Sequence, residues 1–204
     1  MTARLRLEPL RVEHAREAVV VFDDVRLHDW TGGAPSSLDE LEARYVRQSA
    51  GRSPDGSQGW LNWMLRRASD GQLVGTVQAT LHRPAAGRLE ASLAWVIGVG
   101  HQGHGYGREG ALAMAQWLRA HGVDELVAYI HPGHDASVGI ARALGLTASD
   151  VVVDGEVRWS GPGAGPRAPL RGSPGPGSRS RAFGVGPGTG PWRGGGWGPG
   201  SATP

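Results

Sequence analysis

The central segment of the sequence reads Leu93-Ala-Trp-Val-Ile-Gly-Val-Gly-His-Gln-Gly-His-Gly-Tyr-Gly-Arg-Glu-Gly110. An apolar run comes first, five glycines follow between Gly98 and Gly107, and apolar residues then recur at helical spacing over residues 108–121. This order predicts a strand, a glycine-rich loop and a helix. Glycines let the backbone approach a ligand closely, and the free N–H groups and positive dipole end of a helix N-terminus favour an anion. The segment therefore predicts a cradle for a diphosphate group.

The glycine spacing keeps a dinucleotide-binding turn open as an alternative. Gly-x-Gly-x-x-Gly patterns begin at Gly98 and at Gly105. Such a turn requires an acidic residue about 20 positions later, at the end of the next strand. Asp124 has about that spacing, but it precedes the apolar run of residues 126–130 instead of ending it. A nucleoside-triphosphate loop of the Gly-Lys-Ser/Thr type is excluded because the sequence contains no lysine.

The spacing of apolar residues predicts the elements on either side of this segment. Strands are expected at residues 4–10, 60–66, 72–81, 89–97 and 126–130 and in a hairpin over 151–159, and helices at about 13–25, after Ser37, at 108–121 and at 137–144. The resulting order is β-α-α-β-β-β-α-β-α-β-β. It predicts an α/β (α+β) fold with a mixed, mostly antiparallel central sheet of about seven strands and about four flanking helices.

Two motifs in this order resemble those of a known family. Gln102-Gly-His-Gly-Tyr-Gly107 is similar to the Gln/Arg-x-x-Gly-x-Gly/Ala signature of the GNAT acetyltransferase superfamily. Pro132-Gly-His-Asp-Ala-Ser137, followed by Leu144-Gly-Leu146, resembles that family's Pro-x-Asn-x-x-Ser and Leu-Gly-Phe, with His134 in place of Asn and Leu146 in place of Phe. The resemblance covers residues 3–160. It is nearest the branch that acetylates ribosomal-protein N-termini, including alanine, and small amines.

The resemblance implies that acetyl-CoA is the co-substrate and that backbone N–H groups of the loop hold its pyrophosphate. The cofactor-binding residues implied in the loop and helix start are Gln102, Gly103, His104, Gly105, Tyr106, Gly107 and Arg108. His134 would replace the Asn that hydrogen-bonds pantetheine, and Ser137 follows it at the start of the next helix. The backbone N–H of Val96 or Ile97, where the strand of residues 89–97 separates from its neighbour, is the expected donor to the thioester carbonyl.

Family chemistry implies direct attack of an amine on the acetyl thioester, which requires a base for the ammonium and an acid for the leaving thiolate. Many relatives use a tyrosine seven positions after the Asn, where this sequence has Ala141. Ser137 is therefore the expected acid, and the alternative is that it only caps its helix. The candidate bases are Glu90, at the start of its strand, and Glu156, in the last hairpin. A relay through water, without a side chain, stays open.

Histidines and tryptophans offer further candidates. The pairs His101-x-x-His104 and His131-x-x-His134 have ring nitrogens that zinc uses as ligands. We expect no metal, because there is no cysteine and because His104 lies in the phosphate loop. Trp30, beside two glycines, is the expected aromatic residue of the acceptor site. The other tryptophans of this part of the chain are predicted in the core and the cleft wall, at 60, 63 and 95.

Residues 161–204 differ from the rest of the chain. Glycine and proline make up 24 of these 44 residues, and apolar periodicity is absent, so the segment is predicted to be disordered. It contains five arginines and no acid; with a total formal charge of +2, residues 1–160 carry 2 − 5 = −3. The basic pI therefore gives no reason to expect a nucleic-acid partner. The alternative is an arginine-glycine tail that stacks nucleic-acid bases on Phe183, Trp192 and Trp197.

The sequence has no cysteine, no apolar run near the roughly 18 residues of a membrane span, and no signal-peptide core. We therefore expect a cytoplasmic protein without a membrane partner, monomeric or homodimeric. We expect a domain of residues 3–160 that acts as an acetyl-CoA-dependent N-acetyltransferase (EC 2.3.1.-) on a primary amine. The alternatives are an acyl-CoA or nucleotide-binding module without catalysis and a dinucleotide-dependent oxidoreductase.

Overall fold

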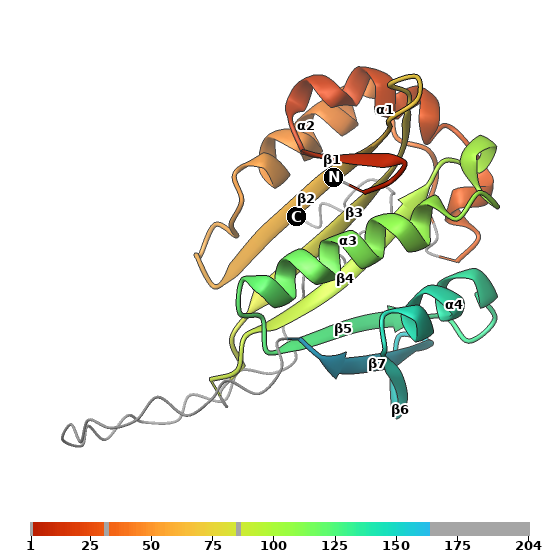
Figure 1. Ribbon diagram of the computed structural model, residues 1–204. Helices are drawn as coiled ribbons and strands as arrows, with labels where there is room; N and C mark the ends of the chain where they lie inside the picture. Colours follow the sequence, from red (N-terminus) through yellow and green to blue (C-terminus); the bar gives the residue numbers. More distant parts are fainter. Residues whose placement is uncertain (1, 31–32, 85–86, 164–204) are drawn as a thin grey trace.

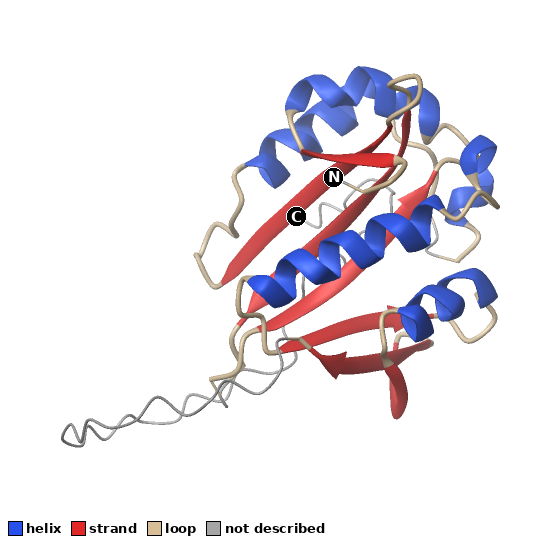
Figure 2. Ribbon diagram, viewed as in Figure 1, coloured by secondary structure: helices blue, strands red, loops and turns tan. Residues whose placement is uncertain are grey.

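The computed structural model describes residues 2–30, 33–84 and 87–163. In these ranges it has one seven-stranded sheet, of strand order β1-β2-β3-β4-β5-β7-β6, and four α-helices (Figures 1 and 2). The strands are β1 (Leu5–Pro9), β2 (Gln58–Arg67), β3 (Leu73–His82), β4 (Glu90–Ile97), β5 (Glu125–Ile130), β6 (Thr147–Val153) and β7 (Glu156–Pro162). The helices are α1 (Ala15–Val21), α2 (Leu38–Ser49), α3 (Tyr106–Ala120) and α4 (Asp135–Ala143). The predicted fold class and element order are confirmed.

Two predicted elements have different bounds. The helix expected over residues 13–25 is broken into a 3₁₀ turn, α1 and a second 3₁₀ turn, Val25–His28. Helix α1 ends at Val21 with Phe22 as its C-cap, and the Asp24 side chain then accepts a hydrogen bond from the Arg26 N–H and begins a new turn. The last strand runs to Pro162, and the Gly163 N–H donates to the Asp124 carbonyl. The predicted disordered tail was expected to begin at residue 161. Its first two residues instead belong to β7, and residues 164–204 lie outside the described residues.

The sheet is divided between β4 and β5. Strands β1 to β4 form an antiparallel meander, and β5, β7 and β6 form a second antiparallel set. Within the described residues the strand pairs that join the two sets are the parallel pairs Glu90↔Glu125, Ala91↔Leu126 and Ser92↔Val127. Beyond Ser92 the strands separate, as Figure 1 shows. We call the gap between residues 93–97 of β4 and 128–130 of β5 the split.

The helices cover the sheet in two layers. Helices α1 and α2 pack on one face around Phe22, Leu41 and Met64, whereas α3 and α4 share the larger core on the other face. Figure 2 shows α3 crossing the near face of the sheet. Along β4, Leu93, Trp95 and Ile97 belong to the α3/α4 face and Val96 to the α1/α2 face, as the alternation of side chains requires. A ligand can therefore reach the split either from the α3/α4 face or from the α1/α2 face of the sheet.

Helix α3 depends on a glycine for its close approach to the sheet. A Cβ at Gly110 would lie 2.7 Å from Leu65 Cδ1 and 3.3 Å from Val77 Cγ1, and both neighbours are fully buried. We expect Gly110→Ala to lower the free energy of unfolding by about 1–2 kcal/mol, because overpacking outweighs the gain in helix propensity. Urea unfolding measures this.

The matched control is Gly139→Ala in α4, where a Cβ meets nothing within 4 Å. This substitution should raise the free energy of unfolding by about 0.5–1 kcal/mol, because alanine replaces glycine in a helix interior without a new contact. Equal effects of the two substitutions would contradict close packing at Gly110.

Candidate active site

Hydrogen bonds hold the glycine loop that follows β4 in one conformation. The Gln102 side chain donates from Nε2 to the Ile97 carbonyl at 3.0 Å, and the His101 N–H donates to the Gly98 carbonyl at 2.8 Å. Gly103 and Gly105 then adopt φ values of +77° and +79°, a left-handed conformation that favours glycine. The predicted loop residue Gln102 therefore holds the end of the strand, and the two glycines turn the chain into α3.

The N-terminus of α3 presents free donors. Its first hydrogen bond of the i, i+4 type runs from the Glu109 N–H to the Gly105 carbonyl at 3.0 Å. The N–H groups of Tyr106, Gly107 and Arg108 precede this bond and have no acceptor within the helix. Together with the positive end of the helix dipole, these groups favour a phosphate or another anion. The predicted loop therefore has the arrangement that a diphosphate site requires.

Gly107 brings this helix start next to the split. A Cβ at Gly107 would lie 3.2 Å from Ile140 Cδ1 of α4 and 3.2 Å from Ile97 Cγ1 of β4. The first turn of α3 is therefore in close contact with both walls of the split on the α3/α4 face. A single ligand can therefore place an anionic group at the start of α3 and an extended arm in the split.

Two N-terminal residues, Thr2 and Arg4, form a clip on this loop that the sequence did not indicate. The Thr2 hydroxyl donates to Glu109 Oε1, and the Arg4 guanidinium donates to Glu109 Oε2 at 2.7 Å and to the His104 carbonyl at 2.9 Å. Arg4 also lies over the Tyr106 ring, 5.1 Å from its centroid. The Tyr106 ring is buried and stacks with His104. Glu109, an acidic residue in the first turn of α3, therefore anchors the first residues of the chain.

The clip makes the Glu109 carboxyl more acidic. Burial alone would raise its pKa, but hydrogen bonds from the Thr2 hydroxyl, the Arg4 N–H and the Arg4 guanidinium hold the pKa below its ordinary value of 4.5. Because the folded pKa is the lower one, the carboxylate stabilises the fold above pH 4.5 and loses this effect as the pH falls through the folded value.

We expect Glu109→Gln to lower the free energy of unfolding by about 1 kcal/mol at pH 7, because hydrogen bonds to a charged group are replaced by weaker ones. The difference from the unchanged protein should shrink as the pH falls below 4.5. Urea unfolding at several pH values measures it. A difference that stays constant down to acid pH would contradict the role of the charge.

The register of β4 decides which N–H groups face the split. The Gly98 N–H donates to the Val74 carbonyl of β3, and the β3–β4 register continues without a bulge to Val96↔Thr76. In an antiparallel ladder alternate residues point to the same neighbour, so the Val96 N–H points to β3 and those of Trp95 and Ile97 point to the split. Trp95 and Ile97 both lie beyond Ser92, the last residue of β4 that pairs with β5. Of the two expected donors, Ile97 therefore has the suitable direction and Val96 does not.

Ser137 faces the split from α4. Its Oγ accepts a hydrogen bond from the Trp95 indole Nε1 at 3.1 Å. The alternative that Ser137 caps its helix is wrong, because His134 is the N-cap residue and Ser137 is the third residue of α4. In the described part of the chain its hydroxyl proton has no acceptor. Ser137 is therefore a half-buried hydroxyl, held in place and able to donate.

An aromatic cluster closes the end of the split. The Trp30 ring stacks on His134, with centroids 5.2 Å apart, and contacts His131 at 4.9 Å. A Cβ at Gly133 would lie only 3.2 Å from the Trp30 ring. Burial and the neighbouring His131 lower the pKa of His134, so its ring is neutral at pH 7. The structure thus brings together Trp30 and His134, which the sequence placed in different roles.

The two candidate bases lie at opposite ends of the β4–β5 region. Glu90 is in the paired end, where its carboxylate contacts Arg158 Nη2 at 3.2 Å and His82 Nε2 at 3.4 Å. Glu156 pairs with Val153 at the start of β7, one residue before the partner of Ile130. Val157 packs in the α3/α4 core, so the adjacent Glu156 side chain lies on the α1/α2 face.

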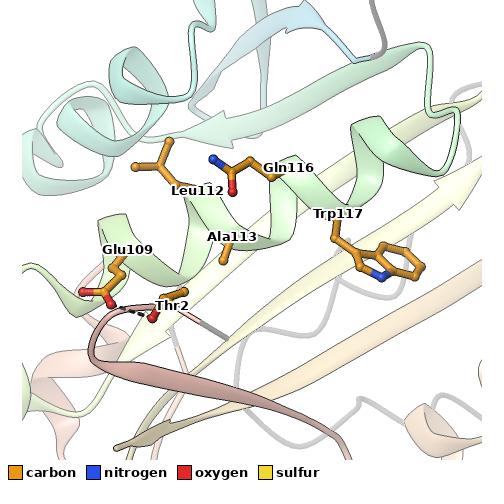
Figure 3. A pocket seen from close by; sticks show the side chains of 6 residues that line it. All are labelled: Thr2, Glu109, Leu112, Ala113, Gln116 and Trp117. Atoms are coloured by element: carbon orange, nitrogen blue, oxygen red, sulfur yellow. Dashed lines mark hydrogen bonds between the residues drawn. The ribbon is translucent and has the colours of Figure 1, made fainter.

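A hollow of about 510 Å³ lies elsewhere, on the outer side of α3 (Figure 3). It is lined by Thr2 and by five residues of α3: Glu109, Leu112, Ala113, Gln116 and Trp117. Among the residues that the structure describes, no three histidine, acidic or cysteine side chains come together to hold a metal ion. No helix within the described ranges is long and apolar enough to cross a membrane.

Comparisons with known proteins agree with this geometry. The model of the acetyltransferase (GNAT) domain family matches residues 4–147. An acetyltransferase from Thermus thermophilus has a similar structure, with 21% identity and a TM-score of 0.62 over 79% of this chain and 99% of its own. A Vibrio cholerae protein proposed to be a ribosomal-protein-serine acetyltransferase has 18% identity and a TM-score of 0.58 over 79% and 95%.

The microcin C7 self-immunity acetyltransferase, solved with acetyl-CoA and AMP, has 12% identity and a TM-score of 0.63 over 78% of this chain and 93% of its own. No curated protein matches the sequence significantly. The family model spans more than half of the chain, and the fold, the glycine loop and the split agree with it. The chain belongs to the GNAT acetyltransferases, enzymes of class EC 2.3.1.- that use acetyl-CoA.

Proposed function

We propose that the protein transfers the acetyl group of acetyl-CoA directly to a primary amine, either a protein N-terminus or a small molecule. The observation that carries this proposal is the N–H triplet at the start of α3, which has no acceptor within the helix and lies beside the split, where Ser137 of α4 contacts Trp95 of β4. The triplet would bind the diphosphate. The split would take the pantetheine arm, with His134 and Ser137 on its α4 wall.

The polar groups along the split suit the reaction. The backbone N–H of Ile97, and that of Trp95 two residues earlier, would donate to the thioester carbonyl and stabilise the negative charge that develops on its oxygen. Ser137 would donate its hydroxyl proton to the sulfur as the carbon–sulfur bond breaks. The amine would approach from the α1/α2 face, where Trp30 borders the entrance.

For the base we propose Glu156, acting directly or through water. A base must lie within hydrogen-bond distance of the amine or one water away. Glu90 is five residues before Trp95, about 17 Å along an extended strand, and it is already paired with Arg158. Glu156 lies on the acceptor face beside the end of β5. This position supports Glu156 over Glu90.

The acceptor branch is the finer part of the proposal. The resemblance to enzymes of ribosomal-protein N-termini and small amines is supported by two proteins of similar fold. One, from V. cholerae, is described as a proposed ribosomal-protein-serine acetyltransferase, and the other is a chimera of the V. cholerae spermidine N-acetyltransferase. We therefore propose peptides with a free N-terminal alanine or serine, and small amines, as the first acceptors to test.

The experiment is a thiol-release assay of the full chain with acetyl-CoA and these amines, with mass spectrometry of the product. We expect release of coenzyme A together with one added acetyl group on the amine, and no turnover with the same peptide already acetylated at its N-terminus. Tight binding of acetyl-CoA without turnover of any amine would support a binding module instead. Tighter binding of NAD than of acetyl-CoA would support the dinucleotide alternative.

A further inference from the structure

The contact between Trp95 and Ser137 spans the split. Trp95 belongs to β4 and Ser137 to α4, and the indole Nε1 lies 3.1 Å from the Ser137 Oγ. Both side chains are half-buried, and Trp95 packs against the larger core. We propose that Trp95 is a positioning residue that directs the Ser137 hydroxyl proton to the leaving sulfur. This inference rests on the proposed function, in which Ser137 is the acid.

The direction of the Ser137 hydroxyl proton follows from the donor and acceptor roles of the indole and the hydroxyl. An indole N–H only donates, so the Ser137 oxygen must accept this bond. The Ser137 hydroxyl can then donate its proton to another acceptor. Within the described residues no protein group takes this proton, and α4 does not use it as a cap. The proton is therefore available to a ligand atom in the split.

The same bond assists the proton transfer itself. When the tetrahedral intermediate collapses, the carbon–sulfur bond breaks and its electron pair goes to sulfur. The Ser137 O–H bond breaks, the proton joins the sulfur, and the electron pair stays on Oγ. This alkoxide then takes the surplus proton of the acceptor nitrogen, which becomes a neutral amide. The indole N–H donates to Oγ throughout, and hydrogen bonds to charged oxygens are the stronger ones, so the contact stabilises the intermediate state most.

The test needs no acceptor, because free coenzyme A serves as the probe. Thiolate absorbs ultraviolet light more strongly than thiol, so a pH titration of the complex reports the pKa of the bound thiol. The directed hydroxyl stabilises the thiolate. We expect Ser137→Ala to lower the acid dissociation constant of the bound thiol about tenfold, one pKa unit, and Trp95→Phe to lower it about threefold or more. Trp95→Phe should have no further effect in the Ser137→Ala background.

The matched control is Trp63→Phe. Trp63 lies on β2, contacts the Trp117 ring at 5.5 Å and has no bond to Ser137. Its replacement removes an indole from the same core and should leave the pKa of the bound thiol unchanged. Calorimetry should give coenzyme A affinities within about threefold for every variant, because the diphosphate site is untouched. A full additional effect of Trp95→Phe in the absence of Ser137 would overturn the inference.

Outcomes for the two proposals are distinguishable. Binding of coenzyme A with the same thiol pKa in all variants would overturn the role of Trp95 and leave the acetyltransferase proposal standing. Failure of the unchanged protein to bind coenzyme A would overturn both. Should Trp95→Phe not fold, the ¹⁵N resonance of the Trp95 indole gives the answer. It should shift in Ser137→Ala while that of Trp63 does not, and an unshifted Trp95 resonance would overturn the inference.

Discussion

Gly105→Glu is expected to weaken acetyl-CoA binding at least about 30-fold. Gly105 has a φ of +79°, which costs an L-residue about 1–2 kcal/mol. The added carboxylate lies at the start of α3, where it repels a diphosphate by about 1–4 kcal/mol at 4 Å. A Cβ there would also be 3.5 Å from Arg4 Nη2, so the new acid competes with Glu109 for that guanidinium. Each 1.4 kcal/mol is a tenfold loss of affinity, so the first two effects, about 2–6 kcal/mol together, correspond to a loss of about 30-fold or more.

Calorimetric titration with acetyl-CoA measures this effect, and two variants separate its causes. Gly105→Ala has the strained backbone without the charge and should lose about tenfold. Gly139→Glu carries the same charge on an exposed position of α4, where a Cβ meets nothing within 4 Å, and should bind within about twofold of the unchanged protein. Unchanged affinity of Gly105→Glu would mean that the glycine loop is not the diphosphate site.

The second large effect is expected for Ser137→Ala, which should lower kcat about 100-fold to 1,000-fold. A positioned acid contributes roughly this much when the leaving group must be protonated. The KM for acetyl-CoA should change less than about threefold, because the diphosphate and carbonyl contacts stay in place. Steady-state kinetics with the best acceptor measures both constants. The control Ser49→Ala removes a hydroxyl from the exposed surface of α2 and should have no effect.

A change of leaving group tests the reason for this loss. An acetyl thioester of a much more acidic thiol, such as nitrothiophenol, leaves without a proton. The difference between Ser137→Ala and the unchanged protein should then shrink to less than about tenfold. A loss of the same size with both thioesters would show that Ser137 acts on binding or structure and not as the acid.

The glycine loop and its helix were predictable because their determinants are local. Glycine spacing and helical periodicity are properties of consecutive residues. The predicted bounds of the loop, of the strand before it and of α3 are all within two residues of the bounds in the structure. The break at Asp24 was missed for the opposite reason. Periodicity continues across it, although α1 ends at Val21 and the bond from the Arg26 N–H to the Asp24 side chain begins a separate turn.

Contacts between distant residues could not be read from the sequence. Arg4 and Glu109 are 105 positions apart, and Trp95 and Ser137 are 42 apart. Nothing local distinguishes these side chains from an ordinary strand-edge arginine or a core tryptophan. The split itself was expected only from the resemblance, because periodicity does not tell where two strands stop pairing.

The direction of the N–H groups along β4 was undecidable for another reason. Val96 and Ile97 are equivalent as sequence positions at the end of an apolar run. Which of them faces β3 depends on the phase of the whole β3–β4 ladder, and the bond from the Gly98 N–H to the Val74 carbonyl shows that phase. A shift by one residue would exchange their roles.

The three residue pairs that join β4 to β5 have a mechanical consequence. Each half of the sheet is a plate held together by long antiparallel ladders. The three parallel pairs between the two plates form a short hinge at the closed end of the split. A small change of angle at this hinge widens the open end without breaking a ladder in either plate. Because one hydrophobic core contains residues of both plates, the side chains of that core set the angle at the hinge and with it the width of the split.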